Sequence, residues 1–195
     1  TATQLPDGFA KTVLSDTKLT QALAAQGPEA IKKALNDPFE AVKSAAGDKK
    51  LRDAAVDAAM KDETFKGAVD KLGLSASDLK QAGDALPHVI DAAQKAAAGD
   101  PQGAVVALAD AAKAAPELVQ KGLKKLGAQL PEGVAKAILT NDAALAQLAK
   151  AGPEAIKTAL TQGPEAALRQ FAGNKELRDT LVDAAMKDPG FAARV

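Results

Sequence analysis

Apolar residues recur at three- and four-residue spacing in short runs along most of the chain, and proline or glycine separates the runs. Residues 51–62 show the pattern clearly, because their leucine and alanine side chains fall on one side of a helix. Proline followed by glutamate, as at Pro28 and Pro153, is typical of a helix start, where proline fixes φ and the carboxylate faces the positive helix end. In the first third of the chain the pattern predicts helices over about 7–15, 18–25, 28–36, 38–46 and 48–61.

The beginning of the chain occurs again near its end. Three stretches return at an offset of 125 or 126 residues, with about half of the aligned positions identical. The pairs are 5–14 with 130–139, 27–35 with 152–160, and 47–62 with 173–188. Duplication of a five-helix block is the simplest explanation, so we expect counterparts of the five helices about 125 residues further on. We also expect the chain to be part of a longer protein.

The segment between the two copies has a different pattern. It predicts two longer helical stretches, over about 76–98 and 101–126, each containing one internal proline, Pro87 and Pro116. Proline inside a helix removes a hydrogen bond and clashes with the preceding turn. We therefore expect each stretch to be broken at its proline.

Together these patterns predict an all-α protein, an array of short helices from a duplicated five-helix block with a period of about 125 residues. The expected organisation is copy 1 over 1–69, a proline-broken helical linker over 70–129 and copy 2 over 130–195. The array is expected to be superhelical or solenoid-like. The alternative is two small helical bundles joined by a helical hairpin.

The composition changes the expected core more than the expected fold. Hydrophobic residues make up 47% of the chain, and about half of them are alanine. Alanine has the highest helix propensity and a small side chain, so helices are expected to approach one another closely. The aromatic residues are five phenylalanines, which we expect to anchor the core: Phe9, Phe39, Phe65, Phe171 and Phe191.

Charge and motifs exclude several classes of function. Lys and Arg balance Asp and Glu at 25 each, so no net field draws the chain to nucleic acid or to an anionic membrane. No run of 18 apolar residues occurs, so an integral membrane protein is not expected. The chain has no cysteine, a single histidine and no glycine-rich phosphate loop. We therefore expect no metal and no cofactor.

Carboxylates four residues apart on the most faithfully repeated helix are the candidates for chemistry. Two such side chains share a face, and paired carboxylates can perform acid–base catalysis. The alternative is a solvated face on which the carboxylates form ion pairs with Lys61 and Lys187, which we favour, so no residue is expected to be catalytic. The candidate binding residues are Arg52, Asp53 and Asp57 in copy 1 and Arg178, Asp179 and Asp183 in copy 2.

The function expected from these observations is non-enzymatic. A helical repeat segment presents a surface to a protein partner, as a scaffold or spacer within a larger protein. A secreted bacterial effector or toxin is a narrower version of this hypothesis, based on the cysteine-free, aromatic-poor composition. The alternatives are a membrane-active helical segment of the pore-forming or translocation type, which we do not favour, and a carboxylate-dependent hydrolase. The sequence leaves the compartment and the oligomeric state open.

Overall fold

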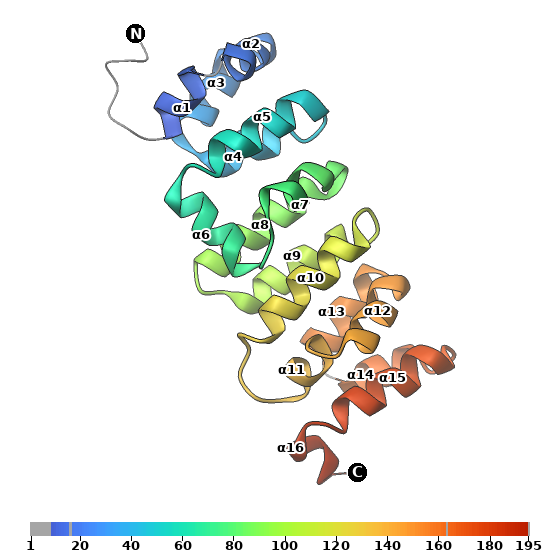
Figure 1. Ribbon diagram of the computed structural model, residues 1–195. Helices are drawn as coiled ribbons and strands as arrows, with labels where there is room; N and C mark the ends of the chain where they lie inside the picture. The colour runs from blue at the N-terminus through green and yellow to red at the C-terminus, as the bar shows by residue number, and fades with distance from the viewer. Residues whose placement is uncertain (1–8, 16, 163, 195) are drawn as a thin grey trace.

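Helices account for most of the chain in the computed structural model, which describes residues 9–15, 17–162 and 164–194 (Figure 1). No strand occurs among these residues, so the all-α prediction is confirmed. None of their helices is long and apolar enough to cross a membrane. The helices are α1 (Phe9–Ser15), α2 (Thr17–Gln26), α3 (Pro28–Asn36), α4 (Pro38–Ser44), α5 (Lys49–Ala59), α6 (Glu63–Lys71), α7 (Ala76–Gln81), the 3₁₀ turn η2 (Gly83–Ala85), α8 (Leu86–Ala97), α9 (Pro101–Ala111), α10 (Pro116–Gly127), α11 (Val134–Leu139), α12 (Asp142–Ala151), α13 (Pro153–Thr161), α14 (Pro164–Gln170), α15 (Lys175–Ala185) and α16 (Pro189–Ala192).

Side-chain caps begin many of these helices. The side chain before the helix accepts a hydrogen bond from a backbone N–H of the first turn, which otherwise has no partner. Such caps are Asp37, Asp48, Asp62, Ser75, Asp100, Asn141, Asn174 and Asp188. At Ser75 the cap is reciprocal, because the Asp78 side chain also accepts the Ser75 N–H.

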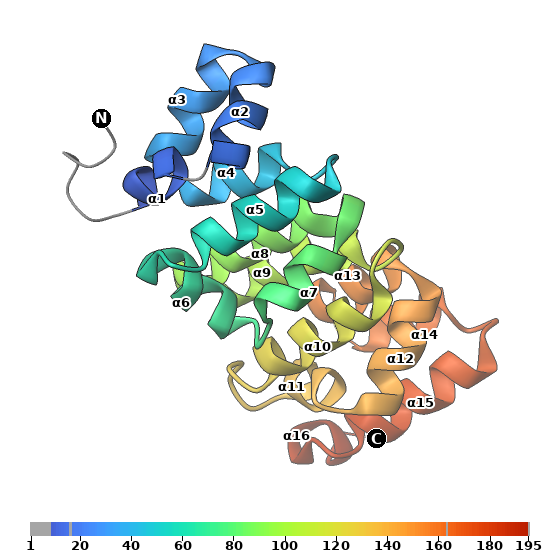
Figure 2. The ribbon, with the colours of Figure 1, turned by 45° about the horizontal axis from the view of Figure 1, so that its top comes forward.

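The helices pack in two layers. Layer A contains α2, α5, α7, α10, α12 and α15, and layer B contains α3, α4, α8, α9, α13 and α14. In layer A, α2 packs on α5, α5 on α7, α10 on α12 and α12 on α15. In layer B, each helix packs on the next one in the order given. Contacts between α4 and α5, α9 and α10, and α12 and α13 join the layers. The first and last helices lie at opposite ends of the molecule in both views (Figures 1 and 2).

Four short helices, α1, α6, α11 and α16, lie along one edge of the layers (Figure 1). The sequence patterns placed no separate helix over Glu63–Lys71, so the prediction of five helices in copy 1 omitted α6. The missed signal is Asp62, whose side chain accepts the N–H of Phe65 and starts the helix. Phe65 is fully buried and holds α6 against the layers.

The middle segment breaks where its prolines predict. Pro87 lies in the first turn of α8 after the 3₁₀ turn, and Pro116 is the first residue of α10. Proline is tolerated at such positions because the first N–H groups of a helix have no intrahelical acceptor. Both predicted breaks are therefore confirmed.

Small side chains allow close contact between helices, as the composition predicts. One cluster of buried hydrophobic side chains extends from Val13 in α1 to Ala184 in α15. Phe39, Phe65 and Phe191 are buried in the core as expected, Phe171 is half-buried, and the Phe9 side chain lies outside the described part of the structure. One close approach between helices is at Gly127, the last residue of α10, where a Cβ atom would lie 2.4 Å from Cβ of Leu139 in α11.

Gly127→Ala is expected to destabilise the protein, because the new methyl group would force α10 and α11 apart. We expect a loss of about 1–3 kcal/mol in the free energy of unfolding, measured by urea denaturation. Gly67→Ala in α6 is the matched control, since nothing lies within 4 Å of its Cβ position. It should increase stability by about 0.5–1 kcal/mol through helix propensity. Equal effects of the two substitutions would contradict the close approach.

Candidate functional site

Polar side chains link successive helices of layer A. Four links follow one another along the layer, from α5 to α15. They are Asp57 to Lys80 at 2.5 Å, Asp78 to Lys121 at 2.6 Å, Lys124 to Asp142 at 2.6 Å and Gln147 to Glu176 at 2.6 Å. Layer A therefore presents a surface of mixed charge, whose polar links join α5, α7, α10, α12 and α15.

The carboxylates of α5 are engaged in this surface rather than with each other. Asp57 pairs with Lys80 of α7, not with Lys61 as the sequence pattern suggested. Asp53 pairs with Lys49 at 2.8 Å, and the hydrogen bond from Lys49 lowers the pKa of Asp53 below its ordinary value. Among the described residues the Asp53 Oδ1 atom has no hydrogen-bond partner. Each of the two carboxylates therefore has its own lysine partner.

The two repeated arginines bind backbone carbonyl groups. Arg52 Nη1 donates to the carbonyl oxygen of Ala46 at 2.7 Å, and its Nε donates to that of Lys80 at 3.0 Å. Arg52 therefore ties the turn before α5 to the next helix of layer A. Arg178 makes a longer bond of 3.5 Å to the carbonyl of Ala172 and binds the Asp179 carboxylate beside it at 2.9 Å.

The remaining candidate, Asp183, is exposed on α15. The structure thus places Arg52, Asp53 and Asp57 near α7, and Arg178, Asp179 and Asp183 on the last long helix of the same layer. It does not bring the two sets together, because α7, α10 and α12 lie between α5 and α15 (Figure 1). The six residues do not form one site.

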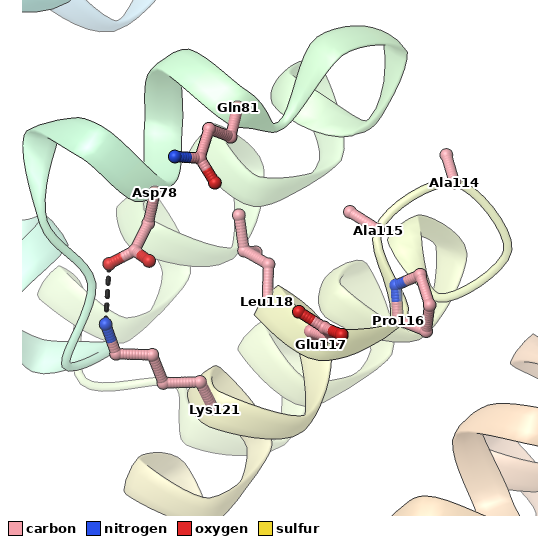
Figure 3. Close-up of a pocket in the computed structure, with 8 residues that line it drawn as sticks. All are labelled: Asp78, Gln81, Ala114, Ala115, Pro116, Glu117, Leu118 and Lys121. Carbon is pink, nitrogen blue, oxygen red and sulfur yellow. Dashed lines mark hydrogen bonds and ion pairs between the residues drawn. The ribbon is translucent and has the colours of Figure 1, made fainter.

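A cleft of about 470 Å³ lies between them, where α7 faces the beginning of α10 (Figure 3). Its polar side chains are Asp78, Gln81, Glu117 and Lys121, and Leu118 points from α10 toward α7 (Figure 3). Ala114, Ala115 and Pro116 line it at the turn into α10. The cleft exists because α7 is only six residues long and leaves the start of α10 uncovered.

The electrostatics of the cleft centre on Asp78. Burial raises the pKa of Asp78, but hydrogen bonds from Lys121 and Ser75 outweigh burial, and the pKa is lowered overall. Asp78 therefore stays ionised as an acceptor for Lys121. Glu117 is exposed on the α10 side, so two carboxylates and one cation line the cleft, and the cleft carries an excess of negative charge.

The cleft brings charged side chains and the aliphatic side chain of Leu118 together. Ligand pockets in proteins combine a few polar groups, which orient the ligand, with apolar contact surface. No group of three or more metal-ligating side chains occurs in the described part of the chain. Comparison with protein-family models, with curated proteins and with solved structures gives no match.

Sequence patterns missed this cleft. Asp78 is recognisable in the sequence as part of a capping box, but Lys121 is 43 residues away, and only the packing of α7 near α10 brings the two together. Pro116 marks a helix break in the sequence. The spacing of residues along the chain does not show that this proline lies opposite the short helix α7.

Lys121→Met is expected to raise the pKa of Asp78 toward its ordinary value, because the ammonium group that stabilises the carboxylate is lost. The folded state holds the pKa below the unfolded value, so this carboxylate contributes stability above about pH 4 and loses it as the pH falls through the folded pKa. Titration of the side-chain carboxyl carbon by NMR measures the shift. Lys124→Met breaks the neighbouring link to Asp142 and should leave the Asp78 titration unchanged.

Arg52→Met is expected to lower the free energy of unfolding by about 1–3 kcal/mol, because it removes two hydrogen bonds from a charged donor to backbone carbonyls. Arg178→Met removes one long bond and an exposed ion pair, and should cost about 0.5 kcal/mol or less. Urea denaturation of both variants measures the difference. A larger loss for Arg178→Met would show that the two arginines are not distinguished by their backbone contacts.

Proposed function

We propose that the chain is a solenoid-like array, built from a duplicated five-helix block, that acts as a non-enzymatic scaffold for a protein partner. The unbroken hydrophobic core from α1 to α15 favours this array over two separate bundles. Local geometry recurs with the sequence repeat, since Gly27 and Gly152 have φ angles of 102° and 98° directly before Pro28 and Pro153. Stacked helical units of this kind use an extended surface for binding.

The cleft between α7 and α10 is the observation that carries the binding function. It lies in the middle of layer A, within the series of polar links, and it combines the Leu118 side chain with charged groups. A segment that fits it presents an apolar side chain to Leu118 and a cation to Glu117. The partner is therefore a peptide segment in which a basic residue stands beside an apolar one.

The affinity is expected to be modest. Interface hot spots are enriched in Trp, Tyr and Arg, and the chain has no Trp and no Tyr. Charge balance also removes long-range steering of an oppositely charged partner. Tight association would then arise from several weak contacts along the layer.

The experiment is selection of peptides from a random display library on the purified chain, followed by titration calorimetry. Gln81→Arg/Glu117→Arg reverses the charge of the cleft at two exposed positions. We expect at least about a tenfold loss of affinity for the selected peptides. The selected sequences should place a basic residue beside an apolar one.

Gln162→Arg/Glu154→Arg, in α13 and at its C-terminal cap, is the matched control. Glu154 follows the first proline of its helix as Glu117 does, and both control positions are exposed in the other layer. This variant should bind with unchanged affinity. Peptides that bind both variants equally, or no peptide enrichment at all, would contradict the proposal.

A further inference from the structure

A second cavity, of about 180 Å³, lies between α9, α11 and α13. It is separate from the cleft of layer A, and five of its six lining residues are aliphatic. Val105 and Leu130 are buried, and the other apolar wall residues are half-buried. The lining residues are Gln102, Val105, Val106, Leu130, Ala135 and Leu160.

An equivalent contact between two helices of layer B occurs earlier in the chain, where α4 packs on α8. We call the α4–α8 contact the first junction and the α9–α13 contact, which holds the cavity, the second junction. Residues 37–42 read Asp-Pro-Phe-Glu-Ala-Val and residues 100–105 read Asp-Pro-Gln-Gly-Ala-Val. In both, the aspartate caps a helix of layer B that begins at the proline, α4 or α9, and that helix packs on the next one, α8 or α13. Gln102 therefore stands where Phe39 stands at the first junction.

The ring of Phe39 is what fills the first junction. It is 8% exposed and lies 5.0 Å, between centroids, from the ring of Phe65 in the edge helix α6. At the second junction the edge helix is α11, which contributes Ala135 to the cavity wall. The first junction thus contains two aromatic rings, and no aromatic side chain lines the cavity at the second.

The polar contact beside the Phe39 ring is also replaced by apolar residues at the second junction. Lys43, four residues after Phe39, donates to Gln94 of α8 at 2.9 Å and pairs with Asp91 at 2.5 Å. Val106, four residues after Gln102, and Leu160 of α13 line the cavity instead. Leu160 and Gln94 each follow by four residues the isoleucine of a Pro-x-x-Ile sequence. The second junction is therefore both emptier and more apolar than the first.

We propose that the cavity between α9, α11 and α13 is a binding site for one monocyclic aromatic ring. Apolar cavities of about 150 Å³ remain dry and bind benzene, so a volume of 180 Å³ suits a single ring. Cofactor-sized ligands need about 300 Å³ or more and do not fit. The ring comes either from a free aromatic compound or from a phenylalanine side chain, and the cleft of layer A is not involved.

Toluene is the probe, and methyl NMR of the whole chain is the measurement. We expect saturable cross peaks from the toluene ring to the methyl groups of Val105, Val106, Leu130 and Leu160. Gln102→Phe restores the ring of the first junction, so it should abolish these cross peaks and raise the melting temperature by a few degrees. Gln170→Phe adds the same ring at an exposed position of α14 and should retain the cross peaks.

Val106→Lys/Leu160→Gln is the second variant, because it introduces the polar pair of the first junction without filling the cavity with a ring. It should also abolish the toluene cross peaks while circular dichroism shows a folded helical chain. No cross peaks in the original chain would overturn the proposal. Cross peaks that persist in a folded Gln102→Phe or Val106→Lys/Leu160→Gln variant would overturn it as well.

The two sources of the ring are separated by competition. A capped Ala-Phe-Ala peptide that displaces toluene, where capped Ala-Ala-Ala does not, assigns the site to a side chain of a partner. Toluene that stays bound in the presence of the phenylalanine peptide assigns it to a free aromatic compound. Both outcomes support the ring site, and neither depends on peptide binding by the cleft between α7 and α10.

Discussion

Every described helix has 12 residues or fewer, and this length governs the rest of the structure. Isolated helices shorter than about 12–15 residues are marginal in water. Each helix therefore depends on the apolar surface that it buries against its neighbours. Because alanine supplies much of that surface, the helices must approach closely, as α10 does to α11 at Gly127. Stability is consequently a property of the stack and not of any single helix.

Polar side chains act differently in such a stack. Exposed ion pairs contribute little stability, so the links from Asp57 to Lys80 and from Lys124 to Asp142 do not hold layer A together. They do define the charge pattern along its surface. Arg52 is different, since its two backbone contacts fix the position of α5 relative to α7. The same helix thus carries a structural arginine and surface carboxylates within a few residues.

Sequence patterns predicted the helices well because helix starts are local. A proline or a capping side chain lies within one turn of the apolar run that follows it, as at Asp37, Ser75 and Pro116. The cleft and the partner of Asp57 could not be predicted in this way. Lys80 and Lys121 come from other helices, and their places follow from how long α7 is and how it packs. The spacing of residues within one helix gives neither the length of α7 nor its packing against α5 and near α10.

The two junctions of layer B share the residues that set the start and the buried face of a helix, and they differ at the residue after the proline. The capping aspartate, the first proline and the buried Ala-Val pair are the same at α4 and α9, because they set where the helix begins and which face it buries. The residue after the proline is not needed for either purpose, and it changes from Phe39 to Gln102. A position free of framework constraints can open a cavity without loss of the fold. Differences between such junctions are therefore where we propose that binding specificity arises.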